Sequence, residues 1–204
     1  CGQRALGEIV EYCGRIATVS LALPIILSFV QEILEYLNHY LPMDIAVIEI
    51  EEVDERFHAR FHAVEKTYMY RIHRSKIPNV FERKFMYTYT EALDVSEMRK
   101  AAQILIGTHD YMAFCGNKKM KKSTVRTVRA INIEETENEL RISYTGDGFL
   151  QNMIRIMTGT LIEVGNGTKS CADIIEILER KERQLAGYTV PPEGLCLVNV
   201  CYKP

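Results

Sequence analysis

The chain has 204 residues, of which 47% are hydrophobic and 25% charged, and 25 Lys and Arg against 27 Asp and Glu give a net charge of -2. These proportions are typical of a globular protein of one large or two small domains, and they exclude disordered and collagen-like chains. The longest apolar stretch, residues 19–30, contains Ser20, Pro24 and Ser28 and is shorter than the roughly 20 residues of a membrane-spanning helix. It also lacks the basic segment that precedes a signal peptide core. We therefore expect a cytoplasmic protein without a membrane partner.

Hydrophobic periodicity predicts strands and helices in alternation along the chain. Strands are expected at residues 7–12, 45–53, 66–73, 124–134, 140–145 and 195–202. Helices are expected at residues 24–39, 94–106, 148–164 and 170–178. Asp94 and Ser170 each begin a capping signal, because an acidic residue follows three positions later in both cases. Interleaved strands and helices with hairpin-like neighbours predict an α+β fold with a largely antiparallel sheet.

Charge is distributed unevenly, because residues 111–133 contain no Asp or Glu. The cations of that stretch are Lys118, Lys119, Lys121, Lys122, Arg126 and Arg129. Such segregation focuses a positive field on one face of a nearly neutral molecule, and Lys and Arg bind phosphate whatever the base sequence. A solvent-exposed charged loop without a binding partner gives the same pattern. The sequence is therefore compatible with both interpretations, a polyanion-binding surface and an exposed loop.

Aromatic and cationic residues also lie side by side in residues 57–63 and 66–71. Proteins use this combination to stack a base while holding its phosphate. The pattern is weak by itself, since Tyr and Phe on a strand are more often core residues and either His58 or His62 is equally typical of a surface.

Arg155 lies in the middle of an apolar helical segment. An arginine buried there needs a carboxylate partner, whereas one that reaches the surface does not. We favour the buried position, which requires an acid elsewhere in the fold. No phosphate-binding loop, dinucleotide-binding turn or metal-ligand spacing is present, and the six cysteines are typical of reduced, buried side chains.

Taken in chain order, many segments resemble successive blocks of the TruA family of tRNA pseudouridine synthases. These segments are residues 2–10, 41–47, 57–61, 66–71, 107–111, 125–128, 148–155, 159–165 and 191–198. They include Lys-Thr-Tyr-Met-Tyr-Arg at 66–71 and Gly-Phe-Leu-Gln-Asn-Met-Ile-Arg at 148–155. Because the likeness runs collinearly through the chain, it is far more specific than any one motif.

The resemblance implies isomerisation of uridine to pseudouridine in the anticodon arm of tRNA, by a homodimer without a metal or organic cofactor. The target base is flipped into a pocket, and an aspartate carboxylate begins the reaction. By position, Tyr68 resembles the tyrosine that packs on the uridine and assists proton removal, and Arg155 resembles the arginine that pairs with the catalytic aspartate. Leu195 resembles the apolar wall of the pocket, and His58 and Arg60 fall in a substrate-binding block. The cations of residues 118–129 are implied to lie near the tRNA backbone.

The family's nucleophile belongs to a Gly-Arg-Thr-Asp block that directly precedes the segment resembling the first residues here. The six aspartates, at positions 44, 54, 94, 110, 147 and 173, lie in other blocks, and Gln3 and Arg4 stand where the family usually has Val-His. We therefore expect these residues to be part of a longer protein that carries the nucleophile. An inactive RNA-binding module of the same fold, and a domain whose basic hairpin serves only solubility, are the alternatives.

The family's fold implies two α+β halves of ferredoxin-like character, with mostly antiparallel sheets side by side and a basic cleft between them. Residues 1–56 together with 195–203 would form the remainder of an incomplete first half. Residues 57–194 would form the second half.

Overall fold

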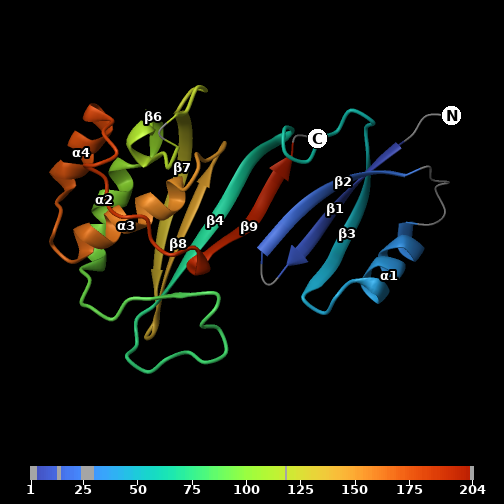
Figure 1. Ribbon diagram of the computed structural model, residues 1–204, viewed down its shortest axis with the longest axis horizontal. Coiled ribbons are helices and arrows are strands. Elements are labelled where there is room, and N and C mark those ends of the chain that lie inside the picture. Colours follow the sequence, from blue (N-terminus) through green and yellow to red (C-terminus); the bar gives the residue numbers. More distant parts are fainter. Residues whose placement is uncertain (1–3, 13–14, 24–29, 118, 203–204) are drawn as a thin grey trace. The chain divides into compact units, whose positions relative to one another are not determined.

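The computed structural model describes residues 4–12, 15–23, 30–117 and 119–202. It contains two compact units, which Figure 1 shows as ribbons. One unit comprises Cys1–Lys66 and Cys196–Pro204, and the other comprises Thr67–Leu195. The boundary at Lys66 falls inside strand β4 (Ala63–His73), so a single strand passes from one unit into the other.

The first unit is built on a three-stranded antiparallel sheet in the order β2-β1-β3. Its strands are β1 (Arg4–Tyr12), β2 (Arg15–Leu23) and β3 (Ile45–Val53), and its helix is α1 (Val30–Tyr40). The Asn38 side chain ties the helix to β3, because Oδ1 accepts from the Val47 N–H at 2.7 Å and Nδ2 donates to the Val47 carbonyl at 2.9 Å.

The predictions for this unit are confirmed for the strands β1 and β3 and for the later part of the helix. The expected start of that helix, at residues 24–29, lies outside the described residues. Strand β2 was not predicted. After Arg15 its residues are apolar except for Thr18 and Ser20, and a mostly apolar run this short fits a buried helix as well as a strand.

The second unit contains a mixed sheet in the order β5-β4-β8-β7-β6. The strands that follow β4 are β5 (Tyr87–Thr88), β6 (Gly107–Asp110), β7 (Val125–Glu135) and β8 (Glu139–Gly146). Strands β6, β7 and β8 pair antiparallel, whereas β5 runs parallel to β4. The last strand, β9 (Leu195–Tyr202), pairs with β4 outside this order, and from Cys196 onward it belongs to the first unit. All four strands predicted in this part of the sequence are confirmed.

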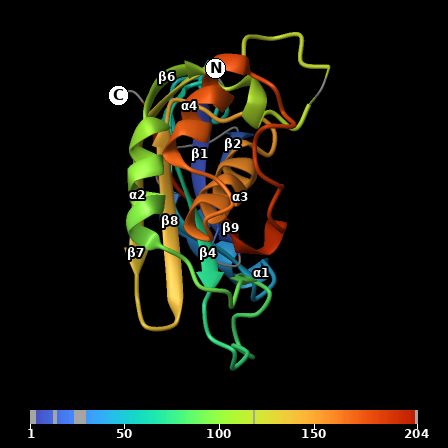
Figure 2. The ribbon, with the colours of Figure 1, turned by 90° about the vertical axis from the view of Figure 1, so that its left-hand side faces the viewer.

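Helices α2 (Val95–Ile104), α3 (Met153–Gly165) and α4 (Cys171–Arg180) lie on one face of this sheet, as Figures 1 and 2 show. Both predicted capping signals are confirmed: Asp94 accepts the Glu97 N–H, and Ser170 and Asp173 form a reciprocal capping box. Helix α3 begins five residues later than expected, at Met153. The cause is Asn152, whose left-handed backbone (φ 60°) cannot belong to a right-handed helix.

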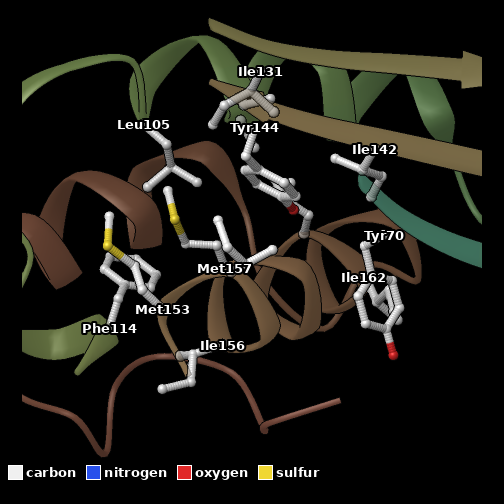
Figure 3. Packing of buried hydrophobic residues seen from close by; sticks show 14 of the residues in the cluster. Tyr70, Leu105, Phe114, Ile131, Ile142, Tyr144, Met153, Ile156, Met157 and Ile162 are labelled. Carbon is white, nitrogen blue, oxygen red and sulfur yellow. The ribbon is translucent and has the colours of Figure 1, made fainter. Parts of the chain in front are cut away.

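Helix α3 is the centre of the core. Eleven of its 13 residues are buried, and only Arg155 and Glu163 are partly exposed. Met157 points toward the strands, whereas Ile156 lies on the other side of the helix (Figure 3). A helix that is apolar all round needs cover on every side. The sheet, α2 and the turn at residues 112–114 supply part of this cover, and the segment before β9 supplies another part.

An ionic cluster centred on the mostly buried Glu139 joins β4 to β8. Arg71 donates from Nε to Glu139 at 2.6 Å and from Nη1 to Glu82 at 3.0 Å, and Arg141 donates to Glu139 at 2.9 Å. The Glu139 side chain is only 12% exposed. Burial by itself raises the pKa of that carboxyl, but the hydrogen bonds and charges of Arg141 and Arg71 outweigh it and hold the pKa below 4.5.

We predict that Glu139→Gln destabilises the protein by about 3 kcal/mol at neutral pH, because it leaves Arg71 buried without its principal partner. A depressed carboxyl pKa stabilises the folded state above the ordinary value of 4.5 and ceases to do so as the pH falls below it. The gap between wild type and variant should therefore shrink below pH 4.5, as measured by urea unfolding at several pH values. Glu176→Gln, which removes an exposed bridge to Arg180, is the control and should cost less than about 1 kcal/mol. A gap that stays constant down to pH 3 contradicts the prediction.

Candidate active site

Two tyrosines on the same face of β4 differ in how far they are buried. Side chains two positions apart on a strand share a face, and Tyr70 is fully buried while Tyr68 is half-buried. The Tyr68 ring meets Phe149 edge-on, with the ring centroids 5.4 Å apart. Burial raises the pKa of the Tyr68 phenol, so the hydroxyl is protonated at neutral pH. Tyr68 thus stands at the margin of the core with a hydroxyl that can donate a hydrogen bond.

Arg155 lies in the first turn of α3 and is half-buried. Its Nε donates to the Val190 carbonyl at 2.7 Å, and its Nη1 donates to Asn152 Oδ1 at 3.1 Å. Within the described ranges no carboxylate forms an ion pair with it. The acid partner expected from the sequence is therefore absent from this part of the chain. Instead, a backbone carbonyl and a side-chain amide oxygen accept hydrogen bonds from two of the Arg155 nitrogens.

Residues 186–194, which we call the strap, run along α3 to the start of β9 (Figure 1). The Gly187 N–H donates to Thr160 Oγ1 at 2.9 Å, and the Tyr70 hydroxyl donates to the Pro191 carbonyl at 2.6 Å. A Cβ at Gly159 would lie only 2.0 Å from the Tyr188 carbonyl oxygen, so the strap reaches α3 only because position 159 has no side chain. Leu195 follows the strap and packs partly buried against the core.

His58 and Arg60 lie in the turn between β3 and β4, in the first unit, and both are exposed. The His58 ring lies 4.3 Å from the Phe61 ring, and the Arg60 guanidinium lies 5.9 Å from the same ring. Tyr68, Arg155 and Leu195 belong to the second unit. The predicted site residues therefore form two groups, one in each unit.

The predicted basic stretch begins in a loop, residues 116–124, and continues along β7. Lys119, Lys121 and Lys122 are exposed and form no ion pair within the described residues, whereas Lys118 lies outside them. Arg126 donates to the Ser123 and Val125 carbonyls, and Arg129 is exposed on β7.

The base of this loop is fixed to the second unit at both ends. The Gly116 N–H donates to the Gln151 carbonyl at 2.8 Å, and Asp110 accepts from Thr124 and pairs with Lys181 at 3.0 Å. The lysines are thus held on an anchored loop.

Metal-binding clusters and membrane-spanning helices are both absent from the part of the chain that the structure covers. No group of three or more His, Cys, Asp or Glu side chains is arranged to hold a metal ion. None of the helices described has the length and apolar character needed to cross a membrane. The described cysteines are free thiols; Cys115 is buried and the other three are half-buried.

Comparison with known proteins decides the family. A family model of tRNA pseudouridine synthases matches residues 101–203. tRNA pseudouridine synthase A of Bacillus subtilis (strain 168) is 46% identical over 166 residues, which are 81% of this chain and 67% of that protein. tRNA pseudouridine synthase A 1 of Clostridium tetani (strain Massachusetts / E88) is 43% identical over 161 residues, which are 79% of this chain and 66% of that protein. The chain belongs to the tRNA pseudouridine synthase family.

The range matched by the tRNA pseudouridine synthase model contains Arg155, Leu195 and the basic loop, whereas Tyr68, His58 and Arg60 precede it. Sequence reasoning missed two polar contacts of this site, those of Tyr70 and Asn152. The only local signal for Asn152 was an asparagine just before a helix, which is usually a cap. Nothing in the sequence showed that Tyr70 would reach a carbonyl 121 positions away.

We predict that Gly159→Ala displaces the strap and destabilises this synthase by roughly 1 to 3 kcal/mol, because a Cβ there overlaps the Tyr188 carbonyl. The unfolding free energy from denaturant titration measures the effect. Gly148→Ala adds the same methyl group where the nearest atoms, those of Arg126, lie 3.8 Å away, and should change stability by less than about 0.5 kcal/mol. Equal effects of the two substitutions would show that α3 and the strap are not in close contact.

Proposed function

We propose that this protein converts uridine to pseudouridine in tRNA. The observation that carries the proposal is the 46% identity, over 81% of the chain, to a protein named tRNA pseudouridine synthase A. The residues that the resemblance assigns to the reaction occupy suitable surroundings. Tyr68 is at the core margin, Arg155 has part of its guanidinium available, and Leu195 is anchored by the strap.

In the proposed reaction the uracil base is detached from the ribose, turned and rejoined through carbon. The base loses a proton from that carbon and gains one on the nitrogen that was released, so no oxidant or reductant is needed. A carboxylate begins the reaction by covalent attack, and the bond that it forms is broken again before the product leaves, so the carboxylate is regenerated. Tyr68 packs against the uridine and assists the proton removal, Arg155 orients the carboxylate, and Leu195 forms an apolar wall that keeps water from the base.

Arg155 is well suited to hold a carboxylate. A guanidinium carries five N–H groups in a rigid plane, and here Nε and Nη1 each form one hydrogen bond inside the protein. Within the described residues Nη2 has no partner. Two bonds fix the plane of the group, and the remaining edge can pair with an acid in a bidentate manner.

We infer that the carboxylate comes from an aspartate in an Arg-Thr-Asp block that the resemblance places before Cys1. None of the six aspartates in the sequence lies in such a block or pairs with Arg155. Asp94 and Asp173 cap helices, Asp110 holds Thr124 and Lys181, and Asp147 accepts the Thr127 N–H. The residues encoded before Cys1 test this inference directly.

We also propose which part of tRNA the protein recognises, how it assembles and which residues contact the RNA. The substrate region is the anticodon arm, the protein acts as a homodimer in the cytoplasm, and the two units correspond to two ferredoxin-like halves beside a basic cleft. His58 and Arg60 bind the substrate, and the cations of residues 118–129 contact the RNA backbone. The exposure of Lys119, Lys121 and Lys122 and their lack of carboxylate partners among the described residues support this last assignment.

We predict that Tyr68→Phe and Arg155→Ala in the full-length protein each slow pseudouridine formation by about 100-fold or more, the usual cost of losing a proton-transfer or charge-stabilising group. Tyr68→Phe removes only the hydroxyl and keeps the ring contact with Phe149. Single-turnover assays on a tRNA transcript give the rate, and filter binding gives the affinity. Tyr36→Phe, at an exposed position of α1, is the control and should leave both unchanged. If the full-length protein binds tRNA but converts no uridine, the alternative of an inactive RNA-binding module is correct.

We predict that replacing Lys119, Lys121 and Lys122 together by alanine weakens tRNA binding and lowers the dependence of affinity on salt. Each lost phosphate contact should reduce the slope of log K against log salt by roughly 0.7 to 0.9. A control that removes three lysines elsewhere, Lys76, Lys84 and Lys100, makes the same change in net charge. If both triple variants weaken binding equally, the loop makes no specific contact with tRNA.

A further inference from the structure

We propose that Asn152 and Tyr70 are positioning residues for this reaction: Asn152 fixes the guanidinium of Arg155, and Tyr70 fixes the strap that ends at Leu195. The inference rests on the proposed function. It goes beyond that function because neither residue is assigned a role by the resemblance.

The Asn152 side chain does not form the hydrogen bond that is usual for an asparagine at the start of a helix. It stands immediately before α3, where an asparagine normally accepts a hydrogen bond from a free N–H of the first helical turn. Asn152 makes no such cap, and its Oδ1 accepts from Arg155 Nη1 at 3.1 Å instead. The Asn152 side chain therefore forms a hydrogen bond with Arg155 and does not cap the helix.

The surroundings of Asn152 hold that side chain in place. Its backbone is left-handed, with φ 60°, a conformation that asparagine tolerates better than most residues. Gly116 lies against it so closely that a Cβ there would be 2.7 Å from Asn152 Nδ2. The Gly116 N–H also donates to the Gln151 carbonyl. The first residue of the basic loop, residues 116–124, is therefore packed directly against Gln151 and Asn152.

Arg155 and Tyr70 donate hydrogen bonds to the carbonyls of two successive residues of the strap. Arg155 donates to Val190, and Tyr70 donates to Pro191 at 2.6 Å. The end of the strap also lies close to the Tyr70 ring, since a Cβ at Gly194 would be 2.8 Å from two ring atoms. Burial raises the pKa of the Tyr70 phenol, which keeps it a donor at any physiological pH. The position of Leu195, the next residue after Gly194, therefore depends on the Tyr70 hydroxyl.

For Asn152 the test is a pair of substitutions in the full-length protein. Asn152→Asp places a carboxylate at the same distance from Arg155 and competes with the nucleophile, so the single-turnover rate should fall by about 100-fold. Asn152→Gly keeps the left-handed backbone but removes Oδ1, and the rate should fall by about 10-fold. Both variants should bind tRNA within about twofold of wild type. A wild-type rate in Asn152→Asp overturns the role of Asn152.

For Tyr70 the chain offers a matched control. Tyr111 is also fully buried, and its hydroxyl donates to the carbonyls of Leu105 and Gly107 away from the strap. Tyr70→Phe and Tyr111→Phe should lower the unfolding midpoint to a similar extent, since each removes the hydroxyl by which a fully buried tyrosine donates a hydrogen bond to the backbone. Only Tyr70→Phe should slow the reaction, by about 10-fold, with tRNA affinity retained. If the two variants lose stability alike and neither loses rate, Tyr70 is only structural and its proposed role is wrong.

A readout that does not depend on activity separates this inference from the proposed function. The Arg155 Nε–H, hydrogen-bonded to Val190, should exchange slowly with solvent in an NMR experiment. It should exchange at least about 10-fold faster in Asn152→Gly and in Tyr70→Phe, but not in Tyr111→Phe. If wild type converts no uridine, the proposed function fails while these exchange rates still decide the positioning roles. Unchanged exchange in both variants overturns the inference.

Discussion

The structure of the second unit depends on the burial of α3. A helix that is apolar around nearly its whole circumference cannot rest on a sheet alone, because half of its surface would remain in water. Helix α2 covers part of that remaining surface, and the strap covers another part, where it approaches so closely that Gly159 has no room for a Cβ. This packing brings Leu195 to the end of the strap and leaves Arg155 as one of only two partly exposed residues of the helix.

Where the strap covers α3, the apolar packing and the polar contacts depend on each other. A segment without regular structure that covers a core needs partners for its backbone groups. The strap obtains them from Thr160, Tyr70 and Arg155, which bond to Gly187, Pro191 and Val190. The contact with Val190 also fixes one side of the Arg155 guanidinium. The core and the candidate active site thus share their hydrogen bonds, so a change in one affects the geometry of the other.

Charge in the second unit is divided between buried and exposed positions. Glu139 compensates Arg71 and Arg141 inside the fold, and Asp110 accepts from Thr124 at the base of the basic loop. The exposed lysines of that loop have no such carboxylate among the described residues. A net charge of -2 is therefore compatible with a positive surface, because the acids that could neutralise it are used in local caps and ion pairs or lie elsewhere along the chain.

Most of the helices and strands could be predicted from the sequence, because side-chain periodicity and capping are local. The strands β3, β4, β7, β8 and β9 and the caps at Asp94 and Ser170 followed from patterns within a few residues. The family, too, was identifiable from collinear blocks. That residues 15–23 form a strand could be seen only in the folded chain, since a short, mostly apolar run fits a strand and a buried helix equally well. The tertiary structure alone also gave Arg155 a carbonyl and an amide for partners, because those groups come from segments whose approach depends on the packing around α3.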